Sequence, residues 1–191
     1  QLLASTVPVC RSYDPAFAFE TALIIRDGLH RMYPDGDPTR GEDVFYYLTL
    51  YNENYPMPAM PQPIYDGLDV VTGIIDGLYP WSPAPKVGGP AVTLLFSGPM
   101  WKVAVDAQSL LAEHYGVGAE LWSATSYQQL RMDAIAVERW NLLHPSESPR
   151  TTKVADLLDR SHGPIVAVTD FMRAVPDQVA RWMPRRYTSL G

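Results

Sequence analysis

The sequence predicts an α/β protein with a doubly wound parallel sheet. Apolar runs without polar alternation occur at residues 44–51, 91–96, 119–124 and 164–169, and such runs are typical of strands covered on both faces. Amphipathic segments of helical length separate most of them. Because strands that alternate with helices build parallel sheets, the pattern favours helices on both faces of the sheet.

The first unit of the pattern is a strand–helix–strand segment. An apolar run at 7–12 leads to Asp14-Pro15, where the carboxylate and the proline favour the start of a helix. Apolar residues at helical spacing extend this helix to about Tyr33. A central strand at 44–51 would complete a right-handed βαβ unit, whose further partners must come from elsewhere.

Two proline-rich breaks divide the chain. Four prolines within 56–63 favour extended backbone and make this segment the best candidate for a linker. We expect a helix at 64–78 and a second break at 80–85. The predicted organisation is therefore a first domain over residues 1–62, a linker over 63–90 and a second domain over 91–191.

The second domain should alternate strands and helices. We expect strands at 91–96, 119–124 and 164–169. Residues 103, 107, 110, 111 and 114 share one face of a helix that Gly116 would end. Further helices should lie at 127–143 and at 175–182, the latter with a proline in its first turn.

Composition excludes several classes of protein. A net charge of -6 and a pI near 5.1 argue against a nucleic-acid partner. No run approaches the roughly 18 apolar residues of a membrane span, so no membrane role is expected. Cys10 is the single cysteine, which rules out an internal disulfide and favours a reducing cytoplasm.

Known catalytic motifs are absent from the sequence. There is no P-loop, and Ser97 lacks the upstream glycine of a nucleophile elbow. The four histidines are dispersed, which argues against a metal site. Gly36-Asp37 is followed by Pro38, so we interpret it as a turn and not as part of a metal motif.

One polar cluster stands out: Asn52, Glu53 and Asn54 directly follow the apolar run at 44–51. Ligands of α/β sheets bind beyond the carboxyl ends of the strands, which favours a substrate-lining role. A polar loop that caps the sheet edge would produce the same pattern. Residue chemistry alone leaves both interpretations open.

The same cluster lies in a longer segment that resembles a known family. Residues 45–61 and 12–18 are similar to the homodimeric type of pyruvate dehydrogenase first (decarboxylating) component, a transketolase-like, thiamine-diphosphate-dependent family. Segments at 115–118, 123–126, 138–145, 169–170 and 187–191 are similar in the same order. The resemblance covers essentially the whole chain.

The resemblance implies a domain assignment. Residues 1–62 would be the second half of a pyrimidine-binding domain, and residues from about 90 onward most of a C-terminal domain that continues past Gly191. The family places its diphosphate and magnesium motif, its activating glutamate and its histidine-bearing loop before Gln1. The resemblance therefore assigns no catalytic residue to this chain, and we expect the 191 residues alone to be inactive.

For the parent protein, the resemblance implies a homodimer that decarboxylates pyruvate on thiamine diphosphate and magnesium and acetylates the lipoyl arm of an acetyltransferase component. By looser similarity to transketolases, Asn52, Glu53 and Asn54 lie near the substrate mouth. Sugar-phosphate enzymes carry an Arg there, and its absence suits a short 2-oxo acid.

Three alternatives stay open. The parent could act on another 2-oxo acid such as 2-oxobutyrate, or this part could be a non-catalytic dimerisation and docking module. A plain transketolase is disfavoured by the missing Arg and by the Pro-rich segment after Asn52.

Overall fold

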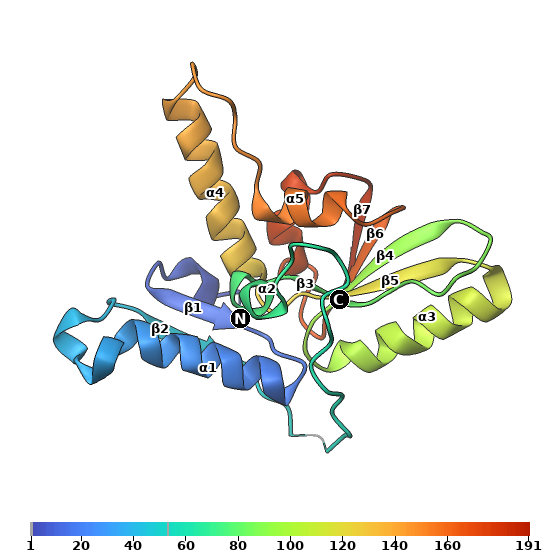
Figure 1. The fold of residues 1–191 in the computed structure, drawn as a ribbon, viewed down its shortest axis with the longest axis horizontal. Helices are drawn as coiled ribbons and strands as arrows, with labels where there is room; N and C mark the ends of the chain where they lie inside the picture. Colours follow the sequence, from blue (N-terminus) through green and yellow to red (C-terminus); the bar gives the residue numbers. More distant parts are fainter. Residues whose placement is uncertain (1, 53) are drawn as a thin grey trace.

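The computed structural model describes residues 2–52 and 54–191, which form two sheets lying side by side (Figure 1). β1 (Cys10–Tyr13) and β2 (Phe45–Leu48) make a two-stranded parallel sheet. The second sheet has five strands in the order β3-β5-β4-β6-β7. The chain is therefore α/β, as the sequence predicts.

The predicted βαβ unit is present. α1 (Ala18–Met32) connects β1 to β2, which pair in parallel from Cys10 opposite Phe45 to Tyr13 opposite Leu48. Two details of the prediction are wrong. α1 begins at Ala18 and not at Asp14-Pro15, and β2 is only half covered, with Phe45 49% exposed. Its one strand neighbour among the described residues is β1, which leaves the second edge of β2 unpaired there.

The five-stranded sheet is centred on β4 (Ala91–Phe96). Its neighbours β5 (Gly118–Ser123) and β6 (Ile165–Val168) run parallel to it, and β7 (Tyr187–Leu190) runs parallel to β6. β3 (Tyr79–Ser82) closes the other edge, antiparallel to β5.

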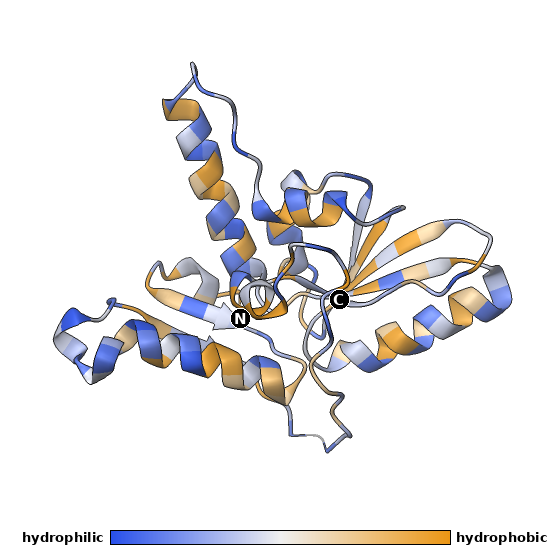
Figure 2. Cartoon of the chain, in the orientation of Figure 1, coloured by the Kyte–Doolittle hydropathy of each residue, from blue (hydrophilic) through white to orange (hydrophobic). Residues whose placement is uncertain are grey.

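Helices cover both faces of this sheet, which confirms the doubly wound architecture. α3 (Trp101–Tyr115) packs Ala104 on one face with Leu94 and Leu121. The opposite face is covered by α4 (Tyr127–Leu143), α5 (Lys153–Asp159) and a 3₁₀ helix (Pro176–Trp182). In Figure 2, α1, α3 and α4 carry both hydrophilic and hydrophobic residues, as expected of helices with one buried face.

Other elements differ from the sequence-based prediction. α2 (Val70–Asp76) is shorter than the helix expected at 64–78, because Asp69 caps its start and Gly77, at φ 107, ends it. The break expected at 80–85 contains part of β3. Proline is tolerated in this position because β3 is an edge strand. α5 and β7 were not predicted, and residues 176–182 form a 3₁₀ helix where we expected an α-helix.

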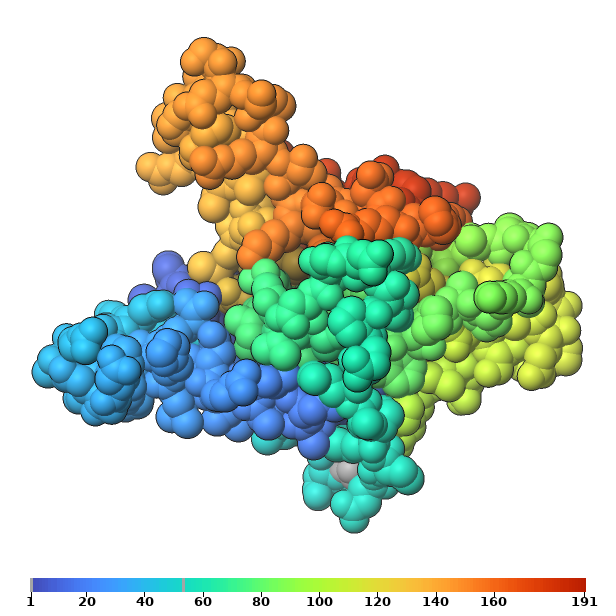
Figure 3. All heavy atoms as spheres, viewed as in Figure 1, coloured from blue at the N-terminus to red at the C-terminus, as the bar shows by residue number. Residues whose placement is uncertain are grey.

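Two parts of the chain extend from the body of the molecule (Figure 3). The outer end of α4 with the loop after it forms one lobe, on which Leu142 and Leu143 are exposed. The segment after β2 forms the other. Short 3₁₀ helices occur at Ala4–Thr6, Pro34–Gly36, Pro38–Arg40 and Gly98–Met100. In the described part of the chain, no helix combines the length and the apolar character needed to span a membrane.

Candidate functional site

The carboxyl ends of strands from both sheets meet around Asp14, which directly follows β1. The amide of Asp14 donates to the Thr125 carbonyl (2.8 Å) after β5, and its carbonyl accepts from the Gly98 amide (3.1 Å) after β4. Thr49, the residue after β2, donates from its amide to the Tyr13 carbonyl (3.1 Å). We call Asp14, Thr49, Tyr51 and Gly98 the strand-end cluster.

The Asp14 carboxylate is the chemical centre of this cluster. It is 2% exposed, and its Oδ1 accepts from Thr49 Oγ1 (2.6 Å) and from the Tyr51 hydroxyl (2.8 Å). Its Oδ2 is buried, and the Ser97 side chain lies near enough to this carboxyl group to favour its charged form. Burial raises the pKa of Asp14, and the hydrogen bonds, chiefly that from Thr49, act against this rise.

Asn52 and Asn54, two of the three site residues predicted from the sequence, lie beside the strand-end cluster. Asn52 and Asn54 are both exposed beyond the end of β2, and Glu53 lies outside the described residues. Tyr51 is fixed by Asp14 on one side of this segment. On the other side, the Tyr55 hydroxyl donates to the Ala16 carbonyl (2.8 Å), and Lys102 Nζ lies 4.2 Å from the centre of the Tyr55 ring. The two asparagines are therefore carried by a segment anchored at both ends.

An apolar cavity of about 430 Å³ lies next to this segment. Its walls come from the first half of α1 with the residues before it, and from Leu50, Tyr51, Tyr55 and Met57. The amide of Ala18, at the free start of α1, donates to Met57 Sδ (3.0 Å). The candidate site therefore has an apolar wall beside exposed amide side chains.

Glu20 is a second buried carboxylate, but its surroundings indicate a structural role. Its Oε1 accepts from the Tyr79 and Ser123 hydroxyls (both 2.7 Å), and its Oε2 accepts from two amides at the start of α1. Burial raises its pKa, against four hydrogen bonds that favour the charged form. Because donors occupy both oxygens, Glu20 links α1 to the second sheet and has no free lone pair directed at a ligand.

The residues set aside in the sequence take structural roles. Asp37 accepts from the Thr39 amide (2.9 Å) as the start of a short helix, and Ser97 Oγ donates to Thr169 Oγ1 (3.1 Å). No three His, Cys, Asp or Glu side chains within residues 2–52 and 54–191 are grouped so that they could hold a metal ion.

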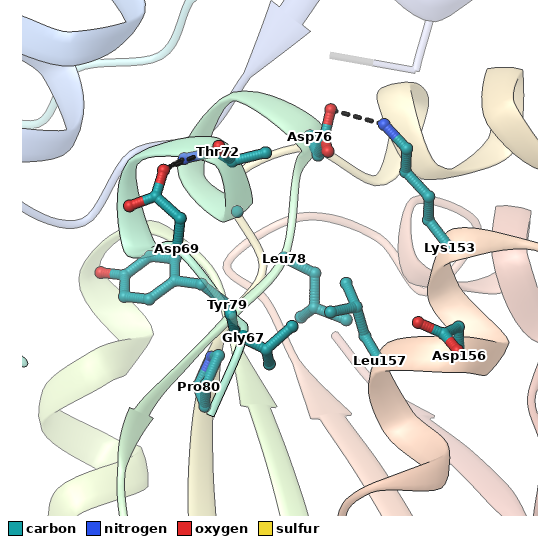
Figure 4. A pocket seen from close by; sticks show the side chains of 12 residues that line it. Gly67, Asp69, Thr72, Asp76, Leu78, Tyr79, Pro80, Lys153, Asp156 and Leu157 are labelled. Carbon is teal, nitrogen blue, oxygen red and sulfur yellow. Dashed lines mark hydrogen bonds and ion pairs between the residues drawn. The ribbon is translucent and has the colours of Figure 1, made fainter. Parts of the chain in front are cut away.

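Another cavity, of about 300 Å³, lies between α2, β3 and α5 (Figure 4). Asp69 in its wall accepts from the Thr72 amide (2.9 Å), and Asp76 forms an ion pair with Lys153 (2.7 Å). Asp69 and Asp76 have partners within the fold, and Asp156, the third carboxylate of this wall, is exposed. We place the candidate site at the strand ends, where two exposed amide side chains lie beside a buried carboxylate and an apolar cavity.

Sequence reasoning missed the role of Asp14, which we expected to cap a helix. The signal that could have found it is the rule that drew attention to Asn52: a polar residue directly after a strand in a parallel sheet. Because Asp-Pro is also typical of helix starts, we interpreted Asp14 as a helix cap and not as a polar residue at the end of a strand.

Two family models match this chain, one in its N-terminal part and one in its C-terminal part. Residues 1–58 match the family model described as the pyruvate dehydrogenase E1 component middle domain, and residues 77–191 match that of the transketolase-like TK C-terminal domain. Structural similarity agrees with this. A transketolase of Pichia stipitis superposes with a TM-score of 0.56 at 14% identity, over 100% of this chain and 22% of the transketolase, and so supports the fold.

Three curated relatives of this chain are all named pyruvate dehydrogenase E1 component. The pyruvate dehydrogenase E1 components of Mycolicibacterium smegmatis and Pseudomonas aeruginosa are 45% and 41% identical, each over 100% of this chain. That of Escherichia coli K12 is 41% identical over 94% of it. The chain spans about a fifth of the length of these relatives. It belongs to the transketolase-like family of pyruvate dehydrogenase E1 components.

Proposed function

We propose that the parent protein decarboxylates pyruvate as a cytoplasmic homodimer and transfers the acetyl group to the lipoyl arm of an acetyltransferase partner. The observation that carries this proposal is the 37–45% identity to named E1 components along essentially the whole chain. Thiamine diphosphate, with magnesium, would supply the electron sink for decarboxylation. Its ligands would come from parts of the parent other than the described residues.

The domain division belongs to the same proposal. Residues 1–62 would be part of the pyrimidine-binding domain, residues 63–90 a linker, and residues 91–191 part of the C-terminal domain. The two family models leave residues 59–76 unmatched between them, which supports a boundary in this region.

Within the parent, we propose that Asn52, Glu53 and Asn54 face the substrate. Asn52 and Asn54 are exposed at the carboxyl end of β2, where ligands of α/β sheets bind. Amide groups donate hydrogen bonds without carrying charge, which suits the carboxylate of a short 2-oxo acid. No Arg lies between residues 41 and 130, so this segment itself offers no guanidinium for a phosphate.

A turnover assay of the full-length parent tests the proposal. The enzyme is supplied with thiamine diphosphate, magnesium and a lipoyl domain, and is given pyruvate, 2-oxobutyrate or a ketose phosphate. We expect the highest kcat/KM for pyruvate and acetylation of the lipoyl domain, detected by mass spectrometry. A preference for 2-oxobutyrate would change the substrate. Turnover of none of these compounds would favour a non-catalytic docking module.

A further inference from the structure

We propose that Asp14 is a positioning residue that sets the place of Asn52 through Thr49 and Tyr51, without itself contacting the substrate. The inference rests on the proposed function, because it needs Asn52 to face the substrate. It concerns how the fold holds that residue.

The position of Asp14 is determined by the second sheet. Its amide and its carbonyl are both hydrogen-bonded to main chain of that sheet's strand ends, at Thr125 (2.8 Å) and Gly98 (3.1 Å). These two contacts lie on either side of the residue's α-carbon. The main chain that carries the carboxylate is therefore held in place by the ends of β4 and β5.

From this position the carboxylate reaches the end of β2. The ladder between β1 and β2 stops at Leu48, so the residues after it need other contacts to be held. Thr49 Oγ1 (2.6 Å) and the Tyr51 hydroxyl (2.8 Å) both donate to Asp14 Oδ1. Tyr51 directly precedes Asn52 in the chain. Asp14 therefore fixes Tyr51, the residue before Asn52, relative to the second sheet.

The contact between Asp14 and Tyr51 needs a glycine at position 98, because any side chain there would enter the same space. The φ of Gly98 is +51°, and a Cβ added there would lie 2.8 Å from both Asp14 Oδ1 and the Tyr51 hydroxyl. A side chain at position 98 would therefore separate the carboxylate from the phenol. The two hydrogen bonds and the glycine form one arrangement, contributed by β1, β2 and β4.

The electrostatics are consistent with a strong contact. Burial, followed by the charge of Asp14 and the hydrogen bond to it, raises the pKa of Tyr51, so this phenol remains a donor at neutral pH. The distances from Asp14 Oδ1 to Thr49 Oγ1 (2.6 Å) and to the Tyr51 hydroxyl (2.8 Å) are those of well-formed hydroxyl hydrogen bonds, which suits an element that must hold a loop in place.

The test uses the full-length parent and the variant Tyr51→Phe, which removes one donor and keeps the ring. We expect kcat/KM for pyruvate to fall about tenfold, the size expected for one hydrogen bond to a charged group. Tyr187→Phe is the matched control. It also removes a partly buried hydroxyl, which donates to the Pro176 carbonyl (2.9 Å) at the far edge of the second sheet, and it should leave kcat/KM unchanged.

A double-mutant cycle separates positioning from general stability. If Tyr51 acts through Asn52, Tyr51→Phe should change kcat/KM less than about twofold in an Asn52→Ala background. Asp14→Asn should keep kcat/KM within about threefold of the parent, because its amide oxygen can still accept both hydrogen bonds.

Independent, multiplying effects of Tyr51→Phe and Asn52→Ala would overturn the proposal, as would an unchanged kcat/KM for Tyr51→Phe. Loss of activity in Asp14→Asn with an unchanged melting temperature would also overturn it, because the carboxylate would then act directly. An unmutated parent that does not turn over pyruvate would instead refute the proposed function, so the two failures are distinguishable.

Discussion

Gln128 pairs with the main chain of Ser12 as a neighbouring strand would. Its Oε1 accepts from the Ser12 amide (2.6 Å) and hydroxyl (3.0 Å), and its Nε2 donates to the Cys10 carbonyl (2.7 Å). The Ser126 hydroxyl adds a bond to the Ser12 carbonyl (2.6 Å). The edge of β1 that faces away from β2 is thereby closed by the first turn of α4, and the two sheets are joined through buried polar contacts.

Gln128→Ala should therefore destabilise the fold more than an ordinary polar substitution. It leaves a buried amide and a buried carbonyl of β1 unpaired, and each such group costs about 1–3 kcal/mol. We expect a loss of about 2–4 kcal/mol, measured by calorimetry on the full-length parent. Gln129→Ala is the control, because it removes a bond to the partly exposed Arg11 and a long contact to Met132 Sδ (4.0 Å), and it should cost about 1 kcal/mol or less. Equal effects of the two variants would contradict this account of the junction.

Gly98→Ala should be more harmful than Gly116→Ala. Both glycines have positive φ, +51° and +61°, so both substitutions strain the backbone by about 1 kcal/mol. Only at position 98 would the new Cβ contact Asp14 and Tyr51; at position 116 it would meet open space. We expect Gly98→Ala to lower both the melting temperature and kcat/KM, and Gly116→Ala to lower the melting temperature alone. Unchanged kinetics in Gly98→Ala would show that the strand-end cluster tolerates displacement.

Glu120 predicts a dependence of stability on pH. It is 7% exposed, and burial raises its pKa although the Tyr65 hydroxyl donates to it (2.7 Å). A raised pKa in the folded state means that ionisation of Glu120 opposes folding, so its stabilising protonated form is lost as the pH rises through the folded pKa. Glu120→Gln should raise the melting temperature near neutral pH and raise it less at about pH 3, where the acid is mostly protonated in both states.

Calorimetry of the parent and of Glu120→Gln at the two pH values checks this prediction. Tyr65→Phe provides the comparison, because it removes the donor and leaves the carboxylate buried. It should lower the melting temperature at neutral pH. A gain in Glu120→Gln that does not depend on pH would show that packing, and not the charge, determines the effect.

The parts of the fold that could be predicted are those with long, strong patterns. β4, β5 and β6 are apolar runs between turn residues, and the helices that follow β4 and β5 run to 15 and 17 residues. β3 contains Pro80, which is normally read as a break, and only its pairing with β5 makes it a strand. α5 has seven residues, too few for helical periodicity to be distinguished from chance.

The candidate site was predictable only in part. Asn52 follows a strand in the sequence, so a local rule could find it. The strand-end cluster joins residue 14 to residues 49, 51 and 98, and local sequence carries no information about such distant pairings. The sequence predicts that β2 is buried on both faces, because its residues are apolar. In the structure β2 is partly exposed, because β1 is its one strand neighbour among the described residues.

The most direct test of the account is the kinetics of Asn52→Ala in the full-length parent, with pyruvate as substrate. If the end of β2 faces the substrate, kcat/KM should fall about tenfold or more while the melting temperature stays unchanged, since a hydrogen bond to a charged group contributes about 1.5–3 kcal/mol. Asn141→Ala, which removes side-chain hydrogen bonds to Arg150 on the outer part of α4, should leave kcat/KM unchanged. Normal kinetics in Asn52→Ala together with a lower melting temperature would contradict the account and identify residues 52–54 as a structural cap of the sheet.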